Sequence, residues 1–273
     1  MLPGETNHPI LTFLERQSMQ YPKQWTDALE LIWGEGMLSP GGLIRVSQML
    51  EGIDISGDRV LDIGSGLGGI DVLLATNHAA ASVIGIDVEP QLITSARDLA
   101  AKKGLAGRVI FQLVTPGKLP FADASFDLVF SKDSMVHMAD KPAIYAEILR
   151  VLKPGGWFIG ADWLWSEGAA ESRVVHAWLS RSQPGFAFTT PATALQALID
   201  AGFAEPTVND FRKELQEANR EEVALLEGSA RQTLAATIGA EMAEGMVASA
   251  KGRQAALDSG DLIPSHLRGR RST

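Results

Sequence analysis

A cluster of glycines near residue 65 is the first part of this sequence whose residue types and spacing could do chemistry. The run Val60-Leu61-Asp62-Ile63-Gly64-Ser65-Gly66-Leu67-Gly68-Gly69 lies where a short apolar stretch gives way to a helical pattern. Glycines at such a turn allow left-handed backbone, let a ligand approach the main chain and leave the amides of the helix N-terminus open. The run therefore indicates a small-molecule site. The alternative is a glycine-rich turn that binds no ligand.

A carboxylate ends the next apolar stretch, in the sequence Gly85-Ile86-Asp87. A carboxylate at that position can accept hydrogen bonds from both hydroxyls of a ribose. Asp87 therefore predicts a ligand that contains a nucleoside. The alternative is that Asp87 caps a helix that begins at Pro90, because aspartate is a favourable N-cap residue.

Groups that could move a proton follow the fourth apolar stretch, in the run Ser131-Lys132-Asp133-Ser134-Met135-Val136-His137-Met138. Asp133 and His137 are four residues apart, which places them on one face if the segment is helical. A carboxylate beside an imidazole can orient the ring as a general base. The alternative is that Asp133 caps this helix and His137 packs in the interior.

The elements that must position these residues alternate between strand and helix. Apolar runs predict strands at 60–63, 83–87, 109–114, 126–131 and 156–162, with helices over 67–77, 90–103 and 140–152. This alternation predicts an α/β fold in which helices cover both faces of a parallel sheet. Later patterns predict a helix over 191–201, a strand near 206–211, one or two helices over 212–257 interrupted near Gly228, and a last strand over 262–270.

Composition limits the class of protein. The chain has 273 residues, of which 45% are apolar and 21% charged, enough for one large globular domain. Its 24 basic and 33 acidic residues give a net charge of −9, which disfavours a nucleic-acid partner. The absence of cysteine excludes thiolate metal sites and disulfides. With no membrane-spanning or secretory pattern, we expect a cytoplasmic protein without a metal.

Four ordered blocks over residues 59–162 resemble the class I S-adenosylmethionine-dependent methyltransferases. They are VLDIGSGLGG at 60–69, IGIDVEP at 84–90, LPFADASFDLVFS at 119–131 and LRVLKPGGWF at 149–158. The resemblance implies a Rossmann-like seven-stranded sheet, with a helical N-terminal cap over 1–58 and a lid over 163–273 that includes a helical insertion and the final strands. The glycine spacing also fits the dinucleotide motif GxGxxG, so an NAD-dependent dehydrogenase remains an alternative.

The same resemblance implies a role for each cofactor-binding residue. Asp62 would lie near the methionine amino group of the cofactor, and the turn would approach its methionine portion. The remaining contacts would come from Gly64, Ser65, Gly66 and Gly68 in the turn, Asp87 on the ribose, Val88 beside the adenine, Thr115 and Pro116 at the adenine edge, and Ser131 on the floor.

The run from Ser131 to His137 also resembles the phosphoethanolamine and the sarcosine/dimethylglycine N-methyltransferases. WGEGMLSPGG at 33–42 is similar to a segment of the phosphoethanolamine group, and Tyr21 falls at the spacing of its active-site tyrosine. The resemblance implies that Tyr21 and His137 close over the ligands and relay the proton of the amine, while Asp133 holds that amine.

The segments that would bind the rest of the substrate depart from the phosphoethanolamine pattern. Trp163, Trp178 and Phe186 stand where that group has tyrosines, and Arg181 or Lys251 could meet an anionic substrate group. SQPGF at 182–186 resembles glycine-type methyltransferases instead. The tryptophans could surround a methylated ammonium, or they could simply pack.

We therefore expect an enzyme, a monomer or homodimer, that transfers a methyl group from S-adenosylmethionine to a small amine of the phosphoethanolamine or glycine/sarcosine/dimethylglycine kind. The alternatives are a natural-product O- or C-methyltransferase acting on an apolar or aromatic molecule, and a non-catalytic regulatory protein that binds the cofactor.

Overall fold

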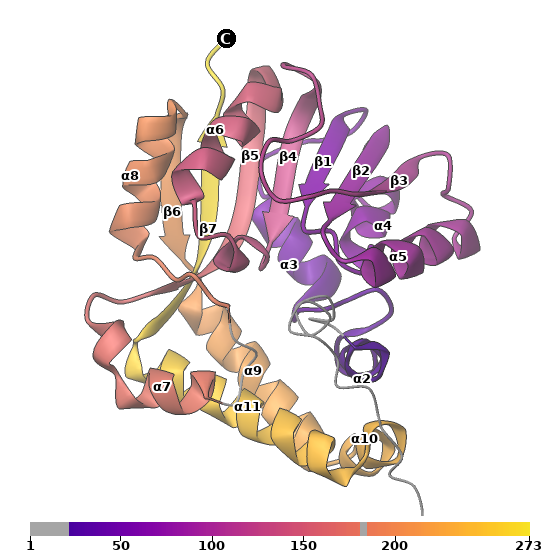
Figure 1. Cartoon of the computed structure of the whole chain (residues 1–273), viewed down its shortest axis with the longest axis vertical. Coiled ribbons are helices and arrows are strands. Elements are labelled where there is room, and N and C mark those ends of the chain that lie inside the picture. The colour runs from indigo at the N-terminus through magenta and orange to yellow at the C-terminus, as the bar shows by residue number, and fades with distance from the viewer. Residues whose placement is uncertain (1–21, 181–184) are drawn as a thin grey trace, which may run out of the picture.

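The computed structural model describes residues 22–180 and 185–273. Within them, seven strands form one sheet in the order β3-β2-β1-β4-β5-β7-β6 (Figure 1). The strands are β1 Arg59–Ile63, β2 Ser82–Asp87, β3 Val109–Leu113, β4 Phe126–Lys132, β5 Leu152–Trp165, β6 Ala204–Asp210 and β7 Leu262–Arg270. β7 runs antiparallel to both of its neighbours, and the pairs among β1 to β5 are parallel. The predicted seven-stranded α/β fold is confirmed.

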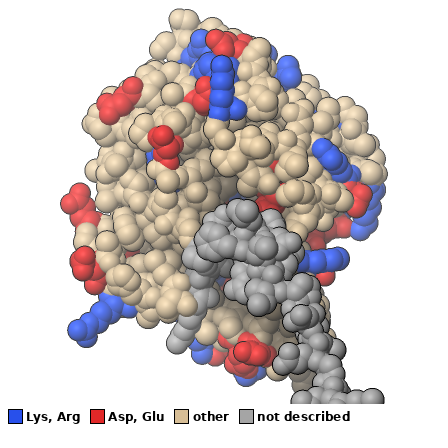
Figure 2. Space-filling view, viewed as in Figure 1, with Lys and Arg blue, Asp and Glu red and all other residues tan. Residues whose placement is uncertain are grey.

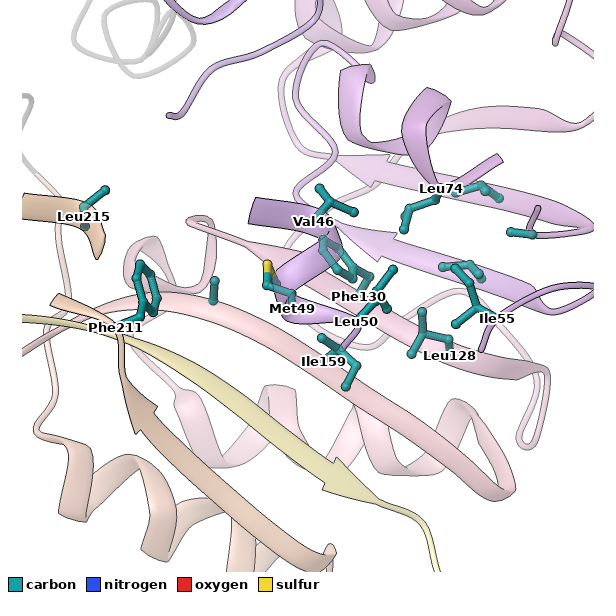
Figure 3. Packing of buried hydrophobic residues seen from close by; sticks show 14 of the residues in the cluster. Val46, Met49, Leu50, Ile55, Leu74, Leu128, Phe130, Ile159, Phe211 and Leu215 are labelled. Atoms are coloured by element: carbon teal, nitrogen blue, oxygen red, sulfur yellow. The ribbon is translucent and has the colours of Figure 1, made fainter. Parts of the chain in front are cut away.

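Helices bury both faces of this sheet, which explains why every residue of β1 after Arg59 is buried. α3 Gly42–Met49, α4 Gly69–Thr76 and α5 Pro90–Lys102 pack on one face, and α6 Lys141–Val151 and α8 Pro191–Ala201 pack on the other. Figure 3 shows the first face, where Val46, Met49 and Leu50 lie against Phe130 and Ile159. The sheet is therefore a rigid, dry support for the loops at its edges.

The order in which strands are added reverses at β1: β2 and β3 lie on one side of it, and β4 lies directly on the other side. Ligands of open α/β sheets bind at such a point, outside the carboxyl ends of the strands. The glycine turn follows β1, Asp87 ends β2 and Lys132 ends β4. The topology therefore brings the residues singled out in the sequence to one edge.

A second helical layer lies beyond that edge. β5 and β6 end there and β7 begins there, so their connections, α7 Arg173–Leu179, α9 Arg212–Glu227, α10 Arg231–Ile238 and α11 Ala240–Ser259, gather below the sheet in Figure 1. Leu29 of α2, which spans Lys23–Trp33, joins their small apolar core. The prediction of one or two helices over 212–257 is wrong: there are three, because Gly239 adopts φ 87° and ψ 152° and ends α10.

The described surface carries charges of both signs. On the face in Figure 2, basic and acidic side chains lie interspersed among uncharged residues. Among residues 22–180 and 185–273, no helix combines the length and apolar character needed to cross a membrane.

Replacing Gly85 with alanine should destabilise the fold. A Cβ there would lie 2.5 Å from Asp71 Oδ1 and 2.7 Å from the Phe111 ring, in the interior of the sheet. Overpacking of this kind costs about 1–3 kcal/mol, which urea denaturation would measure. Gly107→Ala is the matched control, because its Cβ would meet nothing within 4 Å. Equal unfolding free energies for the two variants would contradict this packing.

Candidate functional site

A cavity of about 850 Å³ opens at the carboxyl edge of the sheet. Its walls come from the segment Gly36–Ser39, the glycine turn after β1, the end of β2, the loop after β3 and the run from Lys132 to Asp140. Small-molecule and cofactor sites typically occupy roughly 300–1,000 Å³. The cavity therefore has the size of a ligand site, and it lies where the topology predicts one.

The glycine turn forms the base of the cavity. Gly64 and Gly66 have φ values of 80° and 56°, and a Cβ at Gly64 would collide with the side chain of Ser134. Both line the cavity, together with Ser65. Gly68 does not line it: this residue is the N-cap of α4 and packs its main chain against the Phe111 ring. The cofactor contact of Gly68 stays a prediction, while its place here is at the start of α4.

Asp87 faces the turn rather than capping the following helix. Its Oδ2 accepts a 2.9 Å hydrogen bond from the Gly66 N–H, and its Oδ1 accepts a 3.0 Å bond from the Glu89 N–H. Glu89 is the N-cap residue of α5, and no side chain caps that helix. Burial raises the pKa of the Asp87 carboxyl, and these main-chain bonds oppose the rise. The carboxylate thus lies at the cavity wall, where a ribose could reach it.

Asp62 lies directly beneath the turn, with 1% of its surface exposed. It does not line the cavity, but its carboxyl meets that of Asp71, which is fully buried on α4. Burial raises the pKa of both groups, and the negative charge of Asp62 raises the pKa of Asp71 further. All four carboxyl oxygens lack a hydrogen-bonding partner among the described residues. The pair gives this region a surplus of acceptors.

These features fit the predicted cofactor. The buried Ser65 hydroxyl also lacks a hydrogen-bonding partner among the described residues. The turn therefore has both a hydroxyl donor and carboxyl acceptors that could bind polar groups of a ligand. Val88, Thr115 and Pro116 line the cavity, where an adenine was expected. Ser131 is fully buried beneath it and donates a 2.9 Å hydrogen bond to the Ile63 carbonyl. Ser134, whose role was not predicted, lines the cavity in place of Ser131.

Asp133 and His137 both line the cavity, although the segment between them is not an α-helix. Asp133 has φ 57°, and a 3₁₀-helix spans Met135–His137. Lys132 Nζ lies 2.5 Å from Asp133 Oδ2 and 2.6 Å from Ser39 Oγ. The carboxylate at the cavity is therefore held by a lysine instead of an imidazole, and Asp140, not Asp133, caps the next helix.

The His137 imidazole is suited to accept a proton. Burial lowers its pKa, and the positive charge of Lys141 lowers it further. The Phe186 ring packs beside it with a centroid distance of 5.1 Å. The lowered pKa favours the neutral form of the His137 imidazole, which is the form a general base requires.

The predicted substrate-binding aromatics pack among themselves. Trp163 stacks on Trp178 at 5.8 Å, Trp178 contacts Phe186 at 6.2 Å, and none of the three lines the cavity. Arg253 already lies 5.8 Å from the centre of the Trp163 ring. Lys251 is half-exposed and pairs with Glu227. The structure therefore packs the aromatic residues where β5 meets α7, with Phe186 as the link to His137.

Tyr21 and Arg181 lie outside the described residues. Ser39 and Lys132, in contrast, are cavity residues that received no role from the sequence, although both lie inside the segments that carry the resemblance. A lysine directly before a candidate catalytic carboxylate was the available signal.

Comparison with known proteins identifies the domain. Residues 54–219 match the family described as "Methyltransferase domain". Phosphoethanolamine N-methyltransferase 3 of Arabidopsis thaliana is 29% identical over 211 residues, covering 77% of this chain and 42% of that protein. O-methyltransferase cnsE of Penicillium expansum is 35% identical over 161 residues, covering 59% of this chain and 57% of the relative. The chain thus spans about two-fifths of the length of the plant enzyme.

Solved structures show the same fold. Haemonchus contortus phosphoethanolamine N-methyltransferase 2 in complex with S-adenosyl-L-methionine has a TM-score of 0.86 at 25% identity, over 96% of this chain and 59% of that one. A putative sarcosine dimethylglycine methyltransferase from Galdieria sulphuraria has a TM-score of 0.75 at 18% identity, over 91% and 97%. With the family match and the geometry of the glycine turn, these findings show that the chain belongs to the class I S-adenosylmethionine-dependent methyltransferases.

Proposed function

We propose that this chain transfers a methyl group from S-adenosylmethionine to the nitrogen of a small amine. The observation that supports the proposal is the shared cavity, which the glycine turn and Asp87 line together with Asp133 and the His137 imidazole, whose pKa is lowered. The relatives named phosphoethanolamine N-methyltransferase support an acceptor of that kind.

The cofactor would lie along the first half of the cavity. Asp87 would bind the ribose hydroxyls in place of one of its present main-chain donors, and Val88 with Thr115 would flank the base. The pair of Asp62 and Asp71 would provide negative charge for the methionine ammonium. When bound, the cofactor supplies a sulfonium methyl group, so that the protein need only align an acceptor and remove its proton.

The acceptor would lie between Asp133 and His137. An amine in water is protonated and cannot attack until it loses a proton, and the neutral imidazole of His137 can take it. Asp133 would hold the nitrogen, while Lys132 neutralises part of the charge of that carboxylate. A zwitterionic acceptor suits this arrangement better than a simple cation, because the cavity presents a carboxylate and an ammonium together.

O- or C-methylation of an apolar molecule is the second candidate. It is favoured by the absence of a tyrosine on the cavity within the described residues, where Tyr145 is fully buried, and by the O-methyltransferase among the relatives. Phenolic hydroxyls that could bind a phosphate are therefore not available from these parts of the chain.

A panel of acceptors tests the proposal. We expect the purified chain to form S-adenosylhomocysteine with phosphoethanolamine, sarcosine or glycine and to give no more than background with phenols and isoprenoids. Turnover on phenols alone would instead establish the second candidate. Binding of S-adenosylmethionine without turnover on any acceptor would indicate a regulatory protein. Binding of NAD without binding of S-adenosylmethionine would indicate a dehydrogenase instead.

Replacing Asp87 with alanine should weaken cofactor binding. Loss of a charged hydrogen-bond acceptor costs about 1.5–3 kcal/mol, so Kd for S-adenosylhomocysteine should rise roughly tenfold to a hundredfold in calorimetric titrations. Asp98→Ala removes an exposed carboxylate from the adjacent helix and should leave Kd unchanged. If the two variants bind equally well, Asp87 does not hold the ribose.

Replacing His137 with alanine should lower kcat by about a hundredfold, the typical contribution of a general base, with little effect on cofactor affinity. The readout is the steady-state rate with the best acceptor of the panel, together with the Kd for S-adenosylhomocysteine. His176→Ala serves as the control because that ring is exposed on α7. A His137 variant that keeps the full rate would remove the imidazole from the mechanism.

A further inference from the structure

A buried ion pair lies behind the turn that carries His137. Lys141 Nζ is 3.4 Å from Asp162 Oδ2, and the two side chains are 9% and 1% exposed. The same ammonium donates a hydrogen bond to the main-chain carbonyl of Met135. Since Met135 begins the 3₁₀-helix that ends at His137, Lys141 is attached directly to the turn that presents the imidazole.

Stability alone does not account for this pair. Removing two charges from water is costly, and apolar residues of similar size often serve equally well or better in the interior. Burial lowers the pKa of Lys141, although the adjacent Asp162 carboxylate opposes that shift. The second oxygen of Asp162 lacks a hydrogen-bonding partner among the described residues. We therefore expect the buried Lys141 ammonium to have a function other than packing.

The charge of Lys141 acts on His137. Its positive charge adds to burial in lowering the pKa of the imidazole. Charged groups that line the cavity near this turn include Lys132 and Asp133 after β4, Asp140, which caps α6, and Glu147 of α6. Asp162 lies behind the turn on β5, and Asp62, Asp71 and Asp87 lie around the glycine turn at the same edge. After burial, the positive charge of Lys141 is the cause that lowers the pKa of His137.

We propose that Lys141 is a positioning residue for proton transfer. It fixes the Met135–His137 turn through the Met135 carbonyl and keeps the His137 imidazole in its neutral form, while Asp162 holds the Lys141 ammonium in place. The inference rests on the proposed function, because its benefit is a base that is free to accept the proton of the acceptor amine before the new bond to carbon forms.

NMR titration of the full chain, with its histidines labelled with ¹³C at Cε1, tests the proposal without reference to turnover. The chain has five histidines, and a His137→Gln sample assigns the relevant signal. In the unmutated protein the His137 midpoint should lie below about 6.5, the value of an unperturbed histidine. Lys141→Met should raise this midpoint, because removing a nearby positive charge favours the imidazolium form. Lys141→Arg, which keeps the charge, should restore it.

The matched control is Lys153→Met, which removes an ammonium paired with Asp127 at 2.8 Å near the opposite end of β4 and β5. It should leave the His137 midpoint unchanged. In kinetic assays, Lys141→Met should lose more of its rate at pH 6 than at pH 8, because the acid limb of the profile moves to higher pH with the His137 midpoint.

Several results would overturn the proposal: an unmutated midpoint at or above about 6.5, an unchanged or lowered midpoint in Lys141→Met, or a Lys141→Arg variant that behaves like Lys141→Met. If Lys141→Met does not fold, Lys141→Gln provides the uncharged variant, and the midpoint of the unmutated protein still decides. Failure of the proposed function gives a different result. If His137→Ala keeps full activity, His137 is not the base, but the effect of Lys141 on the His137 midpoint in the unmutated protein is still measured by NMR.

Discussion

Burial of charge at the carboxyl edge of the sheet is the constraint on which the site depends. Asp62, Asp71, Lys132, Lys141 and Asp162 are all nearly inaccessible to water. Each is tolerable only because the fold supplies a partner: a second carboxyl, a carboxylate or a main-chain carbonyl. The strands must end in register for these partners to meet. The geometry of the sheet therefore fixes the electrostatics of the cavity.

The segments outside the sheet close this edge. Gly36 accepts a 3.0 Å hydrogen bond at its carbonyl from the Gly69 N–H, and Ser39 contacts Lys132. These contacts join the segment before β1 to the glycine turn and to the end of β4. Trp163 of β5 and Trp178 of α7 stack within the core that α9 and α11 also cover. Both coverings reduce the access of water, which strengthens every charge interaction inside.

The elements of the fold were largely predictable from the sequence, because parallel strands buried on both faces produce apolar runs and the glycine turn has a distinctive spacing. The third helix of 212–257 was missed because Gly239 ends a helix inside a stretch otherwise favourable to helices. The cofactor residues followed from short motifs, since Asp87 is separated from the turn by a single helix and strand.

Residues whose roles arise from tertiary contacts were not predictable. Lys132 meets Ser39 across 93 positions, and Lys141 meets Asp162 across 21, so neither pairing leaves a local pattern. The helical spacing of Asp133 and His137 suggested a direct pair, but the left-handed backbone at Asp133 and the short 3₁₀-helix change their relation. The sequence does not show that Trp163 and Trp178 stack on each other, because this contact forms only in the folded chain. Both residues were therefore predicted to contact a ligand.

One cavity should hold the cofactor beside an amine acceptor. The most direct measurement is a crystal structure of the chain with S-adenosylhomocysteine and phosphoethanolamine. We predict the ribose hydroxyls on Asp87, and the amine nitrogen within hydrogen-bonding distance of Asp133, beside His137 and facing the sulfur. An amine bound elsewhere, or an adenosine that does not contact Asp87, would contradict the claim.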